Sequence, residues 1–182
     1  MRLKKSFFDK NTIAVAKNLL GKKIVRVFDN GVRIEAIITE TEAYHGLNDR
    51  ASHASRKKTE RNKIMFDHPG LVYVYLVYGM HYCLNFVTMR EGFPAAVLVR
   101  AIKLEQEIRS AKSETISGPG KVCRELKIDK SFYGENLATS KRIWAEEGRI
   151  KIKKNDIIAS RRVGVNYAGE SVEWLWNFKI KI

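Results

Sequence analysis

Hydrophobic and polar residues follow two different periods along this chain, and both occur in short segments. Near the start, over residues 6–20, apolar residues recur at helical spacing. Ser6 is a candidate N-cap, and Gly21 follows the last apolar position, where a helix commonly ends. The pattern therefore predicts one helix that opens the chain.

Residues 23–28 and 32–39 are rich in β-branched and other apolar residues, and Asn30-Gly31 lies between them. Because Asn and Gly tolerate the positive φ angles of a tight turn, this arrangement predicts a β-hairpin. If the second strand stays extended as far as residue 44, strict alternation places six side chains on one face. These are Ile34, Ala36, Ile38, Glu40, Glu42 and Tyr44.

From residue 45 to residue 70 the chain is polar and basic, which predicts a long loop. Period-2 patterns return afterwards, with strands predicted over 71–77, 81–88, 95–101, 156–160 and around 172–182. Helices are predicted over 103–112 and from 117–121 to about 126. Short strands with a few helices predict the α+β class, as one compact domain over residues 1–182 with a curved, mostly antiparallel sheet and flanking helices.

The formal charge is +14, from 34 Lys and Arg against 20 Asp and Glu. A balance this basic favours a polyanionic partner, and nucleic acid is favoured over a membrane because no basic amphipathic helix dominates. No apolar run reaches the roughly 18 residues of a membrane span, and a polar N-terminus argues against a signal peptide. We therefore expect a cytoplasmic protein without a membrane partner.

The two cysteines and four histidines do not have the spacing of a disulfide framework or of a zinc site. We therefore expect Cys83 and Cys123 to be small buried hydrophobic residues, and we expect no metal. The segment 117–121 is also no nucleotide-binding P-loop, because the leading glycine and the Ser or Thr after Lys121 are missing.

The hairpin predicted over 71–88 carries several aromatic residues. Tyr73 and Tyr75 share one face by strand parity, and Tyr78 lies at the turn beside Gly79. Tyrosine favours strands in any sheet, so Tyr73 and Tyr75 have an ordinary structural explanation. That explanation is weaker for Tyr78, because a turn tip is a poor place to bury a ring. In a basic protein, such a hairpin resembles a wedge for a base stack.

Two carboxylates, Glu40 and Glu42, stand beside Tyr44 at the end of an apolar strand. One carboxylate could activate a water and stabilise a cationic transition state, as hydrolysis of an N-glycosidic bond requires. The alternative is a solvated strand end, and parity does not choose between the two glutamates. Asn85 and Arg100 lie in apolar strands, so each needs a buried partner, and Glu42 would suit Arg100.

Several motifs occur together and in order: Glu40-Thr41-Glu42-Ala43-Tyr44, Arg61-Asn62, Tyr73-Val74-Tyr75, Tyr78-Gly79-Met80, Asn85, Leu98-Val99-Arg100, Ser117-Gly118-Pro119 and Arg162-Val163-Gly164-Val165. In these motifs the chain closely resembles the alkyladenine (3-methyladenine, methylpurine) DNA glycosylases, from about residue 7 to the C-terminus. The resemblance implies a compact α+β domain with a protruding hairpin that intercalates into DNA. It also implies hydrolytic release of damaged purines from duplex DNA.

The resemblance further implies a role for individual residues. Glu42 matches the general base, while Arg100 and the Val163 carbonyl match groups that hold the attacking water. Tyr78 matches the intercalating wedge. The base pocket would be formed by Tyr44, His53, Tyr75 and Asn85, with Asn85 obstructing the exocyclic amino group of guanine. Two details depart from the family pattern: a longer spacing between Asn85 and Arg100, and His45 after the pocket tyrosine.

For the DNA backbone we expect phosphate contacts from Arg61, Lys63 and Lys121. The resemblance implies a monofunctional enzyme that leaves an abasic site and needs no cofactor. We expect a monomer that associates with the nucleoid through DNA. Two alternatives remain at this point: a non-catalytic basic module that binds the minor groove, and a hydrolase that modifies RNA.

Overall fold

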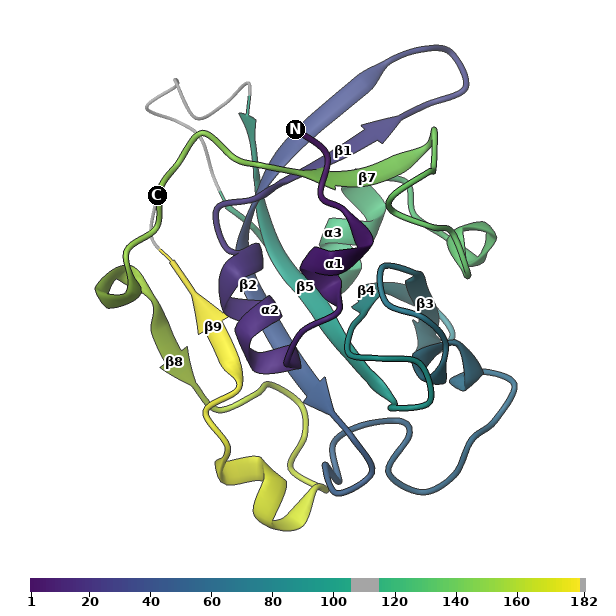
Figure 1. The fold of residues 1–182 in the computed structure, drawn as a ribbon, viewed down its shortest axis with the longest axis vertical. Helices are drawn as coiled ribbons and strands as arrows, with labels where there is room; N and C mark the ends of the chain where they lie inside the picture. The colour runs from purple at the N-terminus through teal and green to yellow at the C-terminus, as the bar shows by residue number, and fades with distance from the viewer. Residues whose placement is uncertain (106–114, 181–182) are drawn as a thin grey trace.

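An antiparallel sheet of nine strands forms the centre of the computed structural model, which describes residues 1–105 and 115–180 (Figure 1). Six strands follow one another in the order β3-β4-β5-β2-β1-β7, while β6 pairs with β5 and β9 lies between β2 and β8. The strands are β1 (Lys23–Val27), β2 (Arg33–His45), β3 (Val72–Val77), β4 (His81–Val87), β5 (Ala95–Leu104), β6 (Ile116–Ser117), β7 (Ile143–Glu146), β8 (Ile158–Ser160) and β9 (Asn177–Lys179).

Strand β2 is the longest and has different neighbours along its length. On one side it pairs with β5 from Ala36 to His45. On the other side, residues 33–37 of β2 pair with β1, and residues 40–42 pair with β9. The carboxylate end of β2 is therefore enclosed by strands from distant parts of the chain, whereas the hairpin with β1 is local.

The prediction that alternating side chains of β2 share one face as far as Tyr44 is wrong, because the ladder between β2 and β5 is irregular. Thr39 of β2 has no residue opposite it on β5, and Arg100 of β5 has none opposite it on β2. An extra residue in a strand shifts the alternation of side chains beyond it. As a result Ala36, Ile38 and Ala43 belong to the same hydrophobic core, while Glu42 and Tyr44 point to the other face. Regular alternation would have directed Glu42 into that core.

Among residues 1–105 and 115–180, three α-helices contribute to the core: α1 (Lys5–Phe8), α2 (Thr12–Leu19) and α3 (Pro119–Glu125). The chain therefore opens with two helices in place of the predicted one. Ser6 lies inside α1 and is not a cap. Asn11 caps α2, since its side-chain oxygen accepts hydrogen bonds from the backbone amides of Ile13 and Ala14. This cap restarts the helix after the break at Asp9.

Other predicted elements agree with the structure in part. Helix α3 lies where it was predicted, and the loop after residue 45 contains only one short 3₁₀ helix, Lys63–Phe66. The helix predicted over 103–112 is wrong at its start, because β5 continues to Leu104. Residues 106–114 of that prediction lie outside the described part of the chain. The strand predicted around 172–182 is confirmed in part: β9 lies within that range, but residues 172–173 belong to a 3₁₀ helix, Gly169–Glu173.

The two faces of the central strands have different coverings. Helices α2 and α3 pack on one face and share the large core, with Val15 and Val122 fully buried. The loop after β2 and the segment 161–173 cover the other face, with smaller apolar clusters around Tyr73 and Val165. Within residues 1–105 and 115–180, none of the helices has the length and apolar character needed to cross a membrane.

Candidate active site

One transverse row of the sheet brings together residues from five strands. Asn177 of β9 lies opposite Glu42 of β2, which lies opposite Leu98 of β5. Leu98 lies opposite Asn85 of β4, which in turn lies opposite Tyr73 of β3. Residues that are opposite one another in a ladder have side chains on the same face. The register of the sheet therefore places the carboxylate of Glu42 and the polar pocket residues along one line.

Glu42 is fully buried and has a partner at each carboxylate oxygen. Oε1 accepts hydrogen bonds from the Val163 backbone amide (2.8 Å) and from Asn177 Nδ2 (3.1 Å), and Arg100 Nε lies 3.6 Å away. Oε2 accepts a hydrogen bond from the Tyr44 hydroxyl at 2.8 Å. A buried carboxylate needs such partners, since burial without them would strongly disfavour its charge. The site thus fixes one carboxylate in a single orientation.

Glu40 shares two of these partners. Its Oε1 accepts hydrogen bonds from Asn177 Nδ2 at 2.6 Å and from Arg100 Nε at 3.1 Å. Arg100 therefore lies closer to Glu40 than to Glu42. The predicted pairing of Arg100 with a carboxylate is confirmed, and both glutamates contact it. Of the two, only Glu42 also contacts Tyr44 and the Val163 amide.

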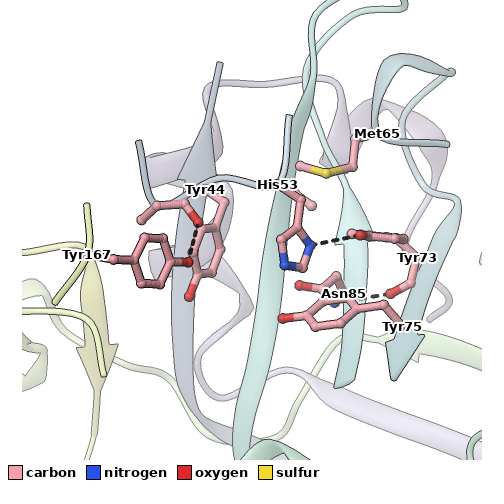
Figure 2. A pocket seen from close by; sticks show the side chains of 9 residues that line it. Tyr44, His53, Met65, Tyr73, Tyr75, Asn85 and Tyr167 are labelled. Carbon is pink, nitrogen blue, oxygen red and sulfur yellow. Dashed lines mark hydrogen bonds between the residues drawn. The ribbon is translucent and has the colours of Figure 1, made fainter. Parts of the chain in front are cut away.

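A pocket lined largely by aromatic side chains lies beside Glu42 (Figure 2). Tyr44 and Tyr167 lie on one side of it, and His53, Tyr73 and Tyr75 lie on the other. The strand parity predicted for Tyr73 and Tyr75 is confirmed, because both side chains line this pocket. Flat rings on two sides of a narrow space form a suitable receptor for another flat ring.

Desolvation shifts the pKa of Tyr44 and of His53, although part of His53 is exposed to solvent. Burial, followed by the charge of Glu42, raises the pKa of Tyr44 well above its ordinary value, so its hydroxyl stays a hydrogen-bond donor. Desolvation among the tyrosines, followed by the charge of Arg61, lowers the pKa of His53 to about 4. His53 is therefore neutral at pH 7. Its Nδ1 lies 2.9 Å from the Tyr73 hydroxyl.

Asn85 lines this pocket and is buried. Its Nδ2 donates hydrogen bonds to the backbone carbonyls of Tyr73 (3.1 Å) and Cys83 (3.2 Å). The amide plane is thereby tied to the two strands of the hairpin. This meets the requirement that a buried amide must find partners.

The turn between β3 and β4 presents large side chains to solvent. Tyr78 is 88% exposed and Met80 is 72% exposed. Tyr78 has a φ of 52°, a left-handed conformation that is uncommon for a residue other than glycine. The residue at the tip is thus exposed and has a disfavoured backbone conformation. Such outliers are often associated with a functional surface.

Arg162 and Asp49 form a fully buried ion pair behind the pocket. Both guanidinium Nη atoms donate to the carboxylate, at 2.6 and 2.7 Å. Arg162 also donates to the Ala43 carbonyl at 2.8 Å, and its guanidinium lies 4.8 Å from the centre of the Tyr44 ring. This pair therefore connects the loop after β2 with the segment that carries Val163.

The three basic residues predicted for the DNA backbone have different surroundings. Arg61 donates to the Leu76 carbonyl at 3.0 Å and lies 5.0 Å from the centre of the Tyr75 ring. Lys63 is exposed and pairs with Glu60. Lys121 is exposed at the start of α3, in a hollow beside the hairpin.

Sequence reasoning missed three residues of this site: Asn177, Tyr167 and Arg162 as a buried partner of Asp49. An asparagine inside an apolar strand was used to identify Asn85, and the same criterion applies to Asn177, which precedes Phe178. Tyr167 lies in a short segment without periodicity. Among residues 1–105 and 115–180, no group of three or more His, Cys, Asp or Glu side chains is arranged to hold a metal ion.

Comparison with known proteins yields one consistent result. Residues 6–182 match the family model described as methylpurine-DNA glycosylase. A protein of Methanocella arvoryzae, named "Putative 3-methyladenine DNA glycosylase", is 44% identical over 185 residues, which cover 97% of this chain and 90% of that protein. A protein of Desulfitobacterium hafniense with the same name is 41% identical over 197 residues, covering 99% and 95% of the two chains.

Proposed function

The chain belongs to the methylpurine-DNA glycosylase family, and from this premise we propose that it flips damaged purines out of duplex DNA and hydrolyses their N-glycosidic bonds with a water activated by Glu42. The protein is a DNA repair glycosylase, and therefore a hydrolase whose substrate is DNA. We propose 3-methyladenine and related alkylated or deaminated purines as the bases.

The proposed mechanism rests on the environment of Glu42. This carboxylate is buried at the edge of an aromatic pocket, and each of its oxygens accepts a hydrogen bond. When the glycosidic bond breaks, positive charge develops on the sugar. A fixed carboxylate stabilises that charge without having to reorganise. The same carboxylate accepts the proton of the attacking water, which adds to the sugar carbon as the purine leaves.

Arg100 and Val163 complete the proposed catalytic group. The resemblance assigns the water to Arg100 and the Val163 carbonyl. The structure shows the Val163 amide, rather than its carbonyl, in contact with Glu42. We therefore propose that the amide orients Glu42, while the adjacent carbonyl and the Arg100 guanidinium hold the water. Val163 is 56% exposed, which supports a location at the mouth of the site.

We propose that the extruded purine enters the pocket between Tyr44 on one side and His53 and Tyr75 on the other. Stacking on aromatic side chains contributes about 1–3 kcal/mol per base. A cationic alkylpurine interacts more strongly with electron-rich rings than a neutral base does. Asn85 would face the edge of the purine and obstruct the amino group of guanine. Because its amide is tied to two carbonyls, it cannot easily turn away.

Tyr78 is the proposed wedge that fills the space left by the flipped nucleotide. Its exposure at the tip of the β3–β4 hairpin supports this role. For the backbone we propose phosphate contacts from Arg61, Lys63 and Lys121. Within the described part of the chain, the ammonium group of Lys121 has no hydrogen-bond or ion-pair partner, which leaves its charge available.

We further propose that residues 1–182 form one glycosylase domain that acts as a monomer on double-stranded DNA. All the proposed catalytic and pocket residues come from this one chain, so the reaction needs no second copy. The mechanism uses protein groups and water, and no cofactor has a role in it.

Single-turnover base release tests the proposal. The substrate is duplex DNA with one hypoxanthine or one alkylated adenine, and the variants are Glu42→Gln, Glu40→Gln and, as a control, Glu173→Gln at an exposed carboxylate. We expect Glu42→Gln to lower the rate by at least about 100-fold with DNA binding retained. Glu173→Gln should match the wild type. Equal losses for Glu40→Gln and Glu42→Gln would refute the assignment of the base to Glu42 alone.

A further inference from the structure

A second hollow lies next to the base pocket and shares the ring of Tyr167 with it. We call it the flank groove. Its polar lining comes from the loop after β2 and from the segment before β9, namely Asn48, Arg50, Ser55, Arg56, Tyr167 and Glu170. The Tyr167 hydroxyl donates to the Ala51 carbonyl at 3.4 Å, so the ring is a wall between the two hollows. The base pocket and the flank groove are therefore neighbours, on either side of Tyr167.

The charges of the flank groove favour an anion. The lining contains two arginines, Arg50 and Arg56, and one carboxylate, that of Glu170. Within the described residues, neither guanidinium group forms an ion pair or a hydrogen bond, although Arg161 and Arg162 nearby are both paired. Two unpaired guanidinium groups in a concave surface are typical of a phosphate site, because their donor geometry matches phosphate oxygens.

The surroundings of Arg50 hold it in place. Its backbone amide donates to the Ser171 hydroxyl at 3.1 Å, which ties the loop to the segment 169–173. Its side chain passes over Gly169, where an added Cβ would lie only 2.9 Å from Nη1. The preceding residue, Asp49, is fixed by the buried pair with Arg162. The groove is therefore attached to the same buried network that orients Tyr44.

We propose that the flank groove binds a backbone phosphate of the damaged strand, next to the extruded nucleotide, through Arg50 and Arg56. This inference rests on the proposed function. A base that leaves the stack takes its sugar with it, and the flanking phosphates must then lie at the mouth of the pocket. The flank groove is the hollow that shares a wall with that pocket. Binding there would lower the free energy of the flipped state without any contact to the base.

The first test is the salt dependence of binding to lesion DNA. The variants are Arg50→Gln, Arg56→Gln and the double variant. The control is Arg149→Gln. Arg149 is exposed and pairs with Glu105, the residue after the end of β5 that is remote from the pocket. Each lost phosphate contact should reduce the slope of log K against log salt by about 0.9, and the control should leave the slope unchanged. We expect the double variant to bind roughly tenfold more weakly.

The second test locates the phosphate. Each phosphate around the lesion is replaced in turn by an uncharged methylphosphonate, and base release is measured with the wild type and the double variant. At one phosphate that flanks the lesion, the losses should not multiply, because the substitution and the variant remove the same contact. At distant phosphates the two losses should multiply.

The outcomes separate this inference from the proposed function. If the wild type releases no base from any lesion, the proposed function fails, and the flank groove with it. If the wild type releases base but the arginine variants behave like Arg149→Gln, only the flank groove is refuted. If the losses from the methylphosphonate and from the double variant multiply at both flanking phosphates, the flank-groove proposal is also refuted. Unfolding curves identical to the wild type would show that the arginine variants are folded.

Discussion

At the scale of single residues, the geometry around Glu42 depends on a donor from the last strand. Asn177 Nδ2 contacts an oxygen of both Glu40 and Glu42, and its Oδ1 accepts a hydrogen bond from the Ser160 hydroxyl at 3.2 Å. One amide thus fixes two carboxylates relative to each other. This role needs no contact with substrate, so Asn177 is a positioning residue.

We expect Asn177→Ala to lower the rate of base release by about tenfold or more, because a buried carboxylate loses a donor. Single-turnover kinetics on lesion DNA would measure this. Ser160→Ala is the matched control, since it removes only the outer partner of the same amide and should have a much smaller effect. Equal rates for Asn177→Ala and the wild type would show that the Val163 amide and Arg100 suffice to hold Glu42.

At the scale of elements, two connections place the pocket: the β3–β4 hairpin and the buried pair between the loop and the segment 161–173. The hairpin carries Tyr73 and Tyr75 on one face and Tyr78 at its tip. The pair Asp49–Arg162 joins two segments that are far apart in sequence. Both connections can be tested by variants that separate structure from chemistry.

For the hairpin we expect Tyr78→Asn to keep or slightly raise stability, because asparagine tolerates the positive φ of this position better than tyrosine does. Lesion capture should nevertheless weaken, since the ring is lost. A fluorescent base analogue at the lesion would report flipping, and thermal unfolding would report stability. Unchanged flipping together with unchanged turnover would remove Tyr78 from the role of wedge.

For the buried pair we expect Asp49→Asn to lower the free energy of unfolding by about 3–5 kcal/mol, because the variant leaves a buried guanidinium without its counter-charge. The neighbouring pair Arg161–Glu173 is exposed, and it provides the control. Arg161→Gln should cost about 0–1 kcal/mol. Urea unfolding of both variants decides this, and a similar small loss in each would mean that the Asp49–Arg162 pair is not structural.

At the scale of the whole molecule, the formal charge of +14 acts on a substrate that is a polyanion. The release of counterions from DNA makes such binding steeply dependent on salt. Several basic residues are already paired with carboxylates or carbonyls, so each of these must exchange a partner to contact a phosphate. Arg61 and Lys63 have partners of this kind, whereas Lys121 has none in the described part of the chain.

We expect Lys121→Gln to reduce the salt slope of DNA binding by about one. Lys151→Gln is the control, because Lys151 is exposed and near the strand β7, which lies outside the transverse row of the site. Fluorescence anisotropy on undamaged duplex DNA at several salt concentrations measures both. An unchanged slope for Lys121→Gln would exclude a phosphate contact.

Much of this protein follows from the sequence by itself. Local periodicity located the hairpins and helix α3, strand parity placed Tyr73 and Tyr75 on one face, and the motifs identified the family. These properties depend on residues close together in the chain. The predicted helix over 103–112 failed at its start, because pairing with β2 extends β5 to Leu104.

Only the tertiary structure decided how the site is assembled. The extra residues Thr39 and Arg100 turn Glu42 away from the core. The local sequence does not predict them, because they arise from the pairing of two strands. Asn177 meets Glu42 across 135 positions of sequence. The register of five strands then aligns both with the base pocket. Such register depends on the packing of the whole sheet, which a strand cannot encode alone.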